Sequence, residues 1–311
     1  MKTGPTRILV LHHNGPGLLA RCLPSVLEAA RSCPIPCRVT VIDNASTDGS
    51  CDRFDREWPG VGLIRETNRG LASFNEVLKR CDEAVVLLLN NDVRLAPDSV
   101  EPLVRAVLEN DDALFSAPQC WTFDGEHYEG MRTRVRRRRG LVQGMSRVPG
   151  HEMLVDRPDL TAAAGPVLAV HRERFLALGG YDPLYFPGRI EDLDLGFRGW
   201  MAGWKGYYVP ESMAWHQGFG SFGPAFGRSG CDRLAIRNTF LFCWKNLEGP
   251  ALRSHLAWLP ARLASSALRG TGEFAAFLEA VGRLKAIRRD RNLPRPDRLR
   301  RQREFFERFA W

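Results

Sequence analysis

The hydrophobic and polar positions of the chain alternate between short apolar runs and longer stretches with helical spacing. The apolar runs predict strands at residues 7–12, 39–43, 63–66, 84–89 and 113–120. Between them, helical spacing predicts helices at residues 18–30, 71–80 and 100–110. The run at 84–89 has no polar position, which is typical of a central parallel strand covered on both faces. This alternation predicts an α/β fold with a mainly parallel sheet flanked by helices.

The second half of the chain has a weaker strand pattern. Residues 121–158 mix Gly, Pro and charge and are expected to be irregular, and short strands are expected at 207–210 and 212–216. Beyond Gly230, helical spacing predicts four helices, at residues 234–245, 252–268, 273–289 and 298–309. We therefore expect an α/β domain over residues 1–225 and a helical C-terminal region over residues 226–311.

Polar side chains follow two of the predicted strands directly. Asp43 ends the strand at 39–43, and Asn91 and Asp92 follow the strand at 84–89. In open α/β sheets, ligands bind beyond the carboxyl ends of the strands. A carboxylate there suits Mg²⁺ or Mn²⁺ carrying a phosphate, and Asp43 can accept a hydrogen bond from a nucleobase or a ribose hydroxyl. The alternative for the loop after Asp43 is a helix N-cap, which Ser46 and Asp48 also fit.

Three acids and one histidine are further candidates. Glu191, Asp192 and Asp194 lie at the start of a predicted helix, where the helix dipole alone favours acidic residues. The other interpretation is that one of them is a general base. His216 ends a predicted strand and precedes residues 217–223, whose glycine-rich composition is typical of a lid.

Charge and composition limit the possible partners. The 311 residues carry a net charge of +8, and Arg134–Arg139 form a basic run. That run is either a solvated face or a contact for an anionic ligand or membrane. No aromatic residue interleaves the arginines, so we expect no nucleic-acid partner. The C-terminal helices interleave arginine with apolar residues, so they either cap the domain or meet an anionic membrane surface.

The same composition gives an expected location. The eight cysteines show no CxxC spacing, no apolar signal region opens the chain, and no stretch approaches 18 apolar residues. These features predict a cytoplasmic protein. Peripheral attachment to the cytoplasmic face of the inner membrane stays open.

Two other functions compete at this point. Gly15 and Gly17 form a Gly-x-Gly-x-x-Ala turn after a strand, and Asp43 ends the next strand, as in NAD(P)-dependent oxidoreductases. That hypothesis leaves Asp92, Asp192 and His216 without a role. The second competitor is a non-catalytic nucleotide- or polyanion-binding protein, which depends on the positive charge.

Five stretches in order resemble the inverting family 2 glycosyltransferases, which have the GT-A fold. The resemblance thus implies a Rossmann-like α/β fold with a mixed, mainly parallel sheet flanked by helices, followed here by a C-terminal helical extension. The resemblance spans roughly residues 7–220 and rests on residues 41–50, Asn68-Arg69-Gly70 with Asn75, 87–93, 179–195 and 208–216. Residues 237–246 also resemble non-processive, rhamnosyltransferase-like members. The Gln-x-x-Arg-Trp motif of processive synthases is absent. The metal motif here has one carboxylate where many members have two.

The resemblance implies a role for each candidate residue within a catalytic domain at 1–225. It implies donor contacts by Asp43, Asn44, Asp48, Asn68, Gly70, Asn75 and Asn91. It implies that Asp92 and His216 bind Mn²⁺ or Mg²⁺, that Asp192 is the general base, and that Glu191, Asp194 and Tyr181 lie on the acceptor side. The donor would be a UDP- or dTDP-sugar, and the acceptor a saccharide or lipid-linked hydroxyl used in cell-surface polysaccharide synthesis. A single displacement with one base predicts inversion at the anomeric carbon.

Overall fold

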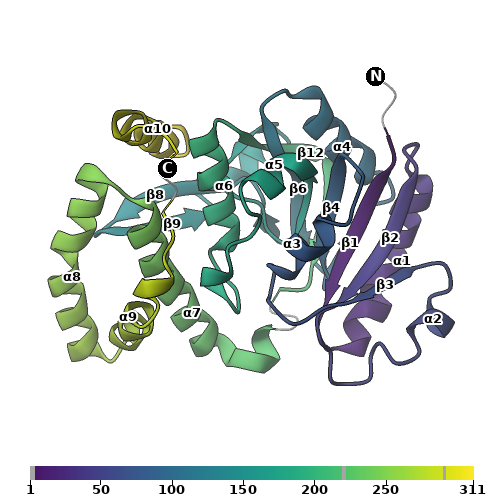
Figure 1. The fold of residues 1–311 in the computed structure, drawn as a ribbon, viewed down its shortest axis with the longest axis horizontal. Coiled ribbons are helices and arrows are strands. Elements are labelled where there is room, and N and C mark those ends of the chain that lie inside the picture. Colours follow the sequence, from purple (N-terminus) through teal and green to yellow (C-terminus); the bar gives the residue numbers. More distant parts are fainter. Residues whose placement is uncertain (1–3, 219–221, 290–291) are drawn as a thin grey trace.

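A computed structural model describes residues 4–218, 222–289 and 292–311. One ten-stranded sheet runs through the molecule, and its main path has the order β10-β12-β6-β11-β4-β1-β2-β3 (Figure 1). The strands of this path are β1 (Thr6–His12), β2 (Cys37–Asp43), β3 (Gly62–Arg65), β4 (Val85–Asn90), β6 (Ala113–Thr122), β10 (Asp159–Thr161), β11 (Val167–His171) and β12 (Lys205–His216). Two short strands join at the side, β5 (Val93–Leu95) on β12 and β7 (Tyr128–Gly130) on β6.

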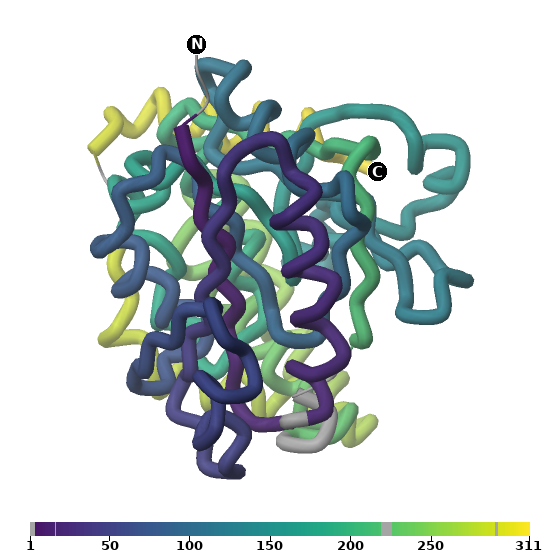
Figure 2. The backbone as a smooth tube through the Cα atoms, turned by 90° about the vertical axis from the view of Figure 1, so that its right-hand side faces the viewer, coloured from purple at the N-terminus to yellow at the C-terminus, as the bar shows by residue number. Residues whose placement is uncertain are grey.

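The sheet is mixed, as the resemblance to the GT-A fold implies. Strands β3, β2, β1 and β4 are mutually parallel, whereas β11 runs antiparallel to both β4 and β6. The helices that follow these strands are α1 (Pro16–Ser32), α2 (Phe54–Glu57), α3 (Ser73–Leu78), α4 (Val100–Glu109) and α5 (Arg172–Ala177). Viewed from the β3 edge in Figure 2, the first strands and α1 are in front and the C-terminal helices lie behind them.

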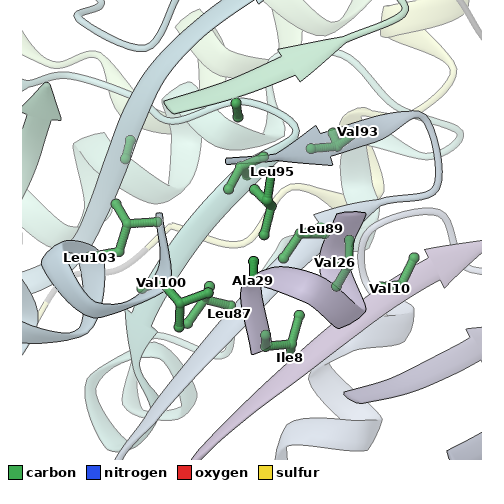
Figure 3. Packing of buried hydrophobic residues seen from close by; sticks show 14 of the residues in the cluster. Ile8, Val10, Val26, Ala29, Leu87, Leu89, Val93, Leu95, Val100 and Leu103 are labelled. Carbon is green, nitrogen blue, oxygen red and sulfur yellow. The ribbon is translucent and has the colours of Figure 1, made fainter. Parts of the chain in front are cut away.

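Strand β4 shows why its run of the sequence has no polar position. Leu87 and Leu89 belong to the hydrophobic cluster on one face of the sheet, with α1 and α4 (Figure 3). Val86 and Leu88 belong to the cluster on the other face, with α3 and α5. Alternate side chains of a strand point to opposite faces, so a strand covered on both sides is apolar throughout. The prediction of a central buried strand is confirmed.

The segment 121–158 is more ordered than expected. Besides β7 it contains an antiparallel hairpin of β8 (Arg134–Arg138) and β9 (Leu141–Met145), and a short helix η1 (His151–Leu154). The basic run is strand β8. Arg134 is buried and forms an ion pair with Asp159, and Arg136 stacks 3.8 Å from the ring of Trp311. The interpretation of the whole run as a solvated face is therefore wrong, because its first residues pack inside the protein.

Two other element boundaries differ from the prediction. The strands expected at 207–210 and 212–216 form one strand, β12, with a register shift between Val209 and Met213. Proline at 210 has no N–H for a ladder bond, which fits this irregularity. The helix expected at 273–289 ends at Val281, where Gly282 follows, and a short helix η3 (Leu284–Ala286) comes next.

The C-terminal helices are packed against the acidic helix. They are α7 (Phe222–Asn246), α8 (Gly249–Arg269), α9 (Glu273–Val281) and α10 (Arg295–Arg308), and they neighbour η2 (Pro183–Tyr185) and α6 (Glu191–Ala202) (Figure 1). The ring of Phe197 in α6 lies 5.5 Å from Phe242 and 5.0 Å from Phe305. One hydrophobic cluster thus joins α6, the β8–β9 hairpin and the C-terminal helices. The division of the chain at residue 225 stays a prediction. Of the described helices, none has the length and apolar character needed to cross a bilayer.

Candidate active site

The carboxyl ends of three parallel strands bring the predicted donor residues to one edge of the sheet. In the β1–β2 register His12 is opposite Asp43, and in the β1–β4 register Leu11 is opposite Asn90. Asn91 and Asp92 directly follow β4. The structure therefore places Asp43, Asn91 and Asp92 where ligands bind to open α/β sheets.

A chain of hydrogen bonds connects the metal motif to the loop after β2. Asn91 Nδ2 lies 2.8 Å from His12 Nδ1, and His12 Nε2 lies 2.8 Å from Ser50 Oγ. Ser50 Oγ donates to Asp48 Oδ1 at 2.5 Å, and Asp48 Oδ2 accepts from Gly15 N at 2.6 Å. Burial lowers the pKa of His12, so the ring is neutral and can accept at Nδ1 while it donates at Nε2. Asn91 and Asp48 thus fix these loops relative to each other.

The remaining donor residues form a second network. Asp43 Oδ2 accepts from Arg65 Nη1 at 2.7 Å, and its Oδ1 accepts from Ser46 N at 2.9 Å. Asn44 Nδ2 donates to Asn68 Oδ1 at 3.1 Å. The same Asn68 oxygen accepts from the N–H of Gly70 at 3.0 Å. These side chains already bond to one another, so they determine the shape of the loop around the strand ends.

Gly70 and Asn75 join this loop to the segment at residues 179–195, which is predicted to lie on the acceptor side. Gly70 has φ +59°, and a Cβ there would lie 2.8 Å from the carbonyl oxygen of Pro187. Only glycine fits both that conformation and that close approach. Asn75 donates to Tyr181 O at 2.8 Å and accepts from Tyr181 N at 2.9 Å. Asn75, predicted as a donor residue, therefore holds the backbone of the acceptor side in this structure.

The two predicted metal ligands lie next to each other. His216 Nε2 is 3.4 Å from Asp92 Oδ2, and His216 Nδ1 is 2.7 Å from Glu129 Oε2. Burial lowers the pKa of His216, but the hydrogen bonds and charges of Asp92 and Glu129 outweigh it and raise this pKa to about 9. The imidazole thus lies between two carboxylates that favour a positive charge at this position.

The donor set around Asp92 fits a hard divalent cation. Asp92 Oδ1 and Gln217 Oε1 are buried, and neither has a hydrogen-bond partner among the described residues. A buried oxygen without a donor is costly, so a positive ligand at this place would be favourable. In the described part of the chain, no group of three or more His, Cys, Asp or Glu side chains is arranged to hold a metal ion unaided. A cation here would therefore need further ligands from water or from the donor.

The three acids at the start of α6 have different environments. Asp194 is fully buried, and its carboxylate accepts from Tyr185 Oη, Arg198 Nε and Lys245 Nζ at 2.6–2.9 Å. Burial alone would raise the pKa of Asp194, but the charges of Lys245 and Arg198 hold it far below its usual range. The carboxylate of Asp194 is thus paired with protein cations, and its place on the acceptor side, which the resemblance implies, stays a prediction.

Asp192 is the partly exposed acid of the three. Its carboxylate accepts from Tyr181 Oη at 3.2 Å. Burial, reinforced by the charge of Glu191, raises the pKa of Asp192 above its usual range, and burial raises the pKa of Glu191 to about 7. Glu191 also lines a small concavity between residues 69–72 and 181–188, where the donor-side loop faces the acceptor-side segment. A carboxylate with a raised pKa is suited to accept a proton near neutral pH.

Sequence reasoning missed several residues of this site. Glu129 lies in a segment that was expected to be irregular, and its contact with His216 depends on pairing of β6 with both β7 and β12. Lys245 lies within the stretch 237–246 that resembles non-processive family members, but nothing there indicated a partner for Asp194. Of the predicted lid at 217–223, residues 219–221 lie outside the described residues.

This fold and this set of strand-end residues define a glycosyltransferase of the GT-A class. Residues 8–161 match the family model described as glycosyl transferase family 2. The chain is also 30% identical over 292 residues to the N-acetylglucosaminyl-diphospho-decaprenol L-rhamnosyltransferase of Mycobacterium tuberculosis, covering 80% of this chain and 91% of the relative. The chain therefore belongs to glycosyltransferase family 2 and resembles its rhamnosyltransferases. The oxidoreductase and non-catalytic alternatives are wrong.

Two solved structures share the fold. The structure of GalNAc-T7 with UDP, GalNAc and Mn²⁺ has a TM-score of 0.54 at 22% identity, and the match covers 69% of this chain and 44% of that chain. The mannosyltransferase PcManGT from Pyrobaculum calidifontis, in complex with GDP-Man and Mn²⁺, has a TM-score of 0.52 at 17% identity, covering 98% and 85%. At these identities the likeness concerns the fold, and it confirms the GT-A prediction.

Proposed function

We propose that this glycosyltransferase is an inverting enzyme in which Asp192 is the general base. The observation that supports this is the different pairing of the two aspartates at the start of α6. Asp194 is occupied by Lys245 and Arg198, whereas Asp192 is partly exposed and accepts from the neutral hydroxyl of Tyr181. Asp192 accepts the proton of the acceptor hydroxyl while the oxygen of that hydroxyl bonds to the anomeric carbon of the donor sugar. The bond from that carbon to the diphosphate breaks on the opposite face, which inverts the configuration.

The donor of this proposal is a UDP- or dTDP-sugar bound at the strand ends. Asp43, Asn44, Asp48, Asn68, Gly70 and Asn91 shape the loops that would enclose the nucleotide. Asp92 and His216 would hold Mn²⁺ or Mg²⁺, which supplies positive charge to the departing diphosphate. The Mn²⁺ in both solved structures and the unpartnered oxygen of Asp92 support this assignment.

The acceptor we infer is a lipid-linked saccharide. The curated relative is named for an N-acetylglucosaminyl-diphospho-decaprenol acceptor and an L-rhamnosyl donor, and the match covers most of both chains. A lipid-linked acceptor would place the enzyme in the synthesis of cell-surface polysaccharide and at the periphery of the membrane. The acceptor saccharide would meet the concavity beside Glu191, near Tyr181.

The proposal is tested with Asp192→Asn, which keeps the shape of the side chain and removes its basicity. We expect transfer to fall by about 10²–10⁴-fold, because a positioned base contributes that much. Binding of UDP or dTDP should stay within twofold of the wild type, and NMR of the wild-type product should show inversion. Normal turnover in Asp192→Asn, or a product with retained configuration, would contradict the mechanism.

A further inference from the structure

The exposed large apolar side chains of this protein are concentrated in α8, α9 and η3. Of the eleven such side chains in the described structure, seven lie within residues 256–284. They are Leu256, Trp258, Leu268, Phe274, Leu278, Val281 and Leu284. Leu268 is 87% exposed and Leu278 is 54% exposed. Single exposed apolar residues are ordinary on a protein surface, but a cluster of this kind indicates a binding surface.

These residues are arranged as outward-facing stripes on two neighbouring helices. On α8, Leu256, Pro260, Ala264 and Leu268 are all exposed at intervals of four residues, which places them on one side of the helix. On α9, exposed Phe274, Leu278 and Val281 are spaced by four and then three residues, which also places them on one side of the helix. A surface helix normally turns its polar side outward. Here α8 and α9 lie at one end of the molecule, far from β1 (Figure 1). Both helices expose large apolar side chains to solvent.

The charge around these stripes is almost entirely positive. Residues 249–289 contain seven Arg or Lys residues and two acids, Glu273 and Glu279. Both acids form ion pairs, with Arg262 and Arg233 respectively. The tip of the β8–β9 hairpin adds exposed Arg138 and Arg139 beside α8, where His255 Nδ1 is 2.8 Å from Gly140 O. Apolar stripes bordered by basic residues are complementary to an anionic lipid surface.

This surface is joined directly to the acceptor side of the active site. Arg283, between Val281 and Leu284, donates through Nη1 to Leu184 O at 2.9 Å and to Phe186 O at 3.0 Å. Leu184 and Phe186 belong to the segment that borders the concavity beside Glu191, and Phe186 is itself exposed. Arg283 therefore connects the α9–η3 junction to the backbone of residues 184–186.

We propose that the outward side of α8, α9 and η3, the α8–α9 face, binds the surface of an anionic lipid bilayer. Its apolar stripes would enter the interfacial region, and its arginines would contact the headgroups. This contact would hold residues 184–186 at the bilayer surface, where the saccharide of a lipid-linked acceptor emerges. The last step rests on the proposed acceptor, whereas lipid binding by this face does not.

The test is flotation of the full chain with vesicles of phosphatidylglycerol and phosphatidylcholine, and with phosphatidylcholine alone. The wild type should bind the anionic vesicles at low salt and lose most of that binding at high salt. Leu268→Glu should weaken binding by about tenfold, because it replaces an exposed leucine that would enter the bilayer interface with a negative charge. Met153→Glu is the matched control: Met153 is 77% exposed and lies outside the α8–α9 face. It should change binding by less than about twofold.

The outcomes separate this surface from the proposed function. Absence of wild-type binding to anionic vesicles, or equal effects of Leu268→Glu and Met153→Glu, would overturn the lipid surface. A wild-type dimer that Leu268→Glu dissociates, without vesicle binding by either, would assign the face to a second copy of the chain. Calorimetry with UDP and dTDP in Mn²⁺ is run on the same samples. Vesicle binding without nucleotide binding would refute the donor assignment and leave the surface intact.

Discussion

The buried ion cluster at the start of α6 makes a quantitative prediction about two neighbouring aspartates. Asp194→Asn removes the negative charge that compensates Lys245 and Arg198, whose side chains are only 5% and 11% exposed. Removing one partner of a buried ion pair typically costs about 3–5 kcal/mol, because the other charge stays buried without compensation. Asp192→Asn keeps an oxygen that can accept the hydrogen bond from Tyr181, and this bond is already long at 3.2 Å, so the substitution should cost less than about 1 kcal/mol.

The measurement is the free energy of unfolding by urea for both variants at pH 7. The pH dependence gives a second check. The pKa of Asp194 in the folded protein lies below its value of about 3.9 in the unfolded chain. The contribution of Asp194 to the free energy of unfolding is therefore complete above about pH 3.9. The contribution is then lost as the pH falls toward the folded pKa. Asp194→Asn should therefore flatten the stability profile below about pH 4.

A double-mutant cycle makes the test sharper. Lys245→Met leaves Asp194 buried with Arg198 and Asn246, so it should also destabilise the protein. The double variant Asp194→Asn/Lys245→Met should cost less than the sum of the two single variants, since each single variant leaves a charge without its partner. Additive costs, or equal costs for Asp194→Asn and Asp192→Asn, would refute the assignment of Asp194 to a structural ion cluster.

Three further predictions concern the donor side. Asp92→Ala should lower the Mn²⁺-dependent affinity for UDP or dTDP at least about tenfold by calorimetry, because Asp92 would be the metal carboxylate; unchanged affinity would remove it from the metal site. Glu129→Gln should weaken Mn²⁺ binding about 10–100-fold in an EPR titration, since the carboxylate of Glu129 orients the ring of His216 through its contact with Nδ1. Equal Mn²⁺ affinity would show that Glu129 has no part in orienting the metal ligand. Gly70→Ala should cost about 1–3 kcal/mol, because its φ is +59° and its Cβ would approach Pro187 O; a urea midpoint equal to the wild type would contradict this close approach.

The sheet could be predicted because its signal is local. The apolar run of β4 and the helical spacing before and after it depend on neighbours within a few residues, and the structure confirms both. The boundary of α9 was missed although Gly282 follows Val281, because the helical spacing continues beyond it. Likewise, the two predicted short strands form the single strand β12 because both pair with β6, one on each side of the register shift. Such features are decided by contacts that the local pattern does not contain.

The site could be predicted only in part, for the same reason. The strand-end residues follow from the α/β pattern, which places Asp43 and Asp92 at one edge. Glu129 and His216 are 87 positions apart in the sequence, and only the pairing of three strands brings them to 2.7 Å. Asn75 was predicted as a donor-binding residue, but its hydrogen-bond partner in the structure is the backbone of Tyr181, which is 106 positions away. Sequence spacing thus located these residues without revealing what they contact.

The C-terminal region has a direct part in positioning the acids of α6. Arg189 and Ile190, which precede Glu191, both have positive φ, at 79° and 74°. Such a conformation is costly for residues other than glycine and persists only when the surroundings fix it. Asn238 of α7 supplies that support, because its Nδ2 lies 2.7 Å from Gly188 O and 2.8 Å from Arg189 O.

Helix α7 also supplies the cation that pairs with Asp194 and not with Asp192. Lys245, at the end of α7, donates hydrogen bonds to both oxygens of Asp194 and to Asp182. The positive charge of Lys245 therefore compensates Asp194. No comparable cation is bonded to Asp192 among the described contacts, and its pKa rises through burial and the charge of Glu191. The same helix thus supports the strained turn and neutralises the neighbouring carboxylate. In the proposed mechanism, both effects leave Asp192 as the acid that accepts the proton, so the helical region would contribute to the chemistry as well as to the core.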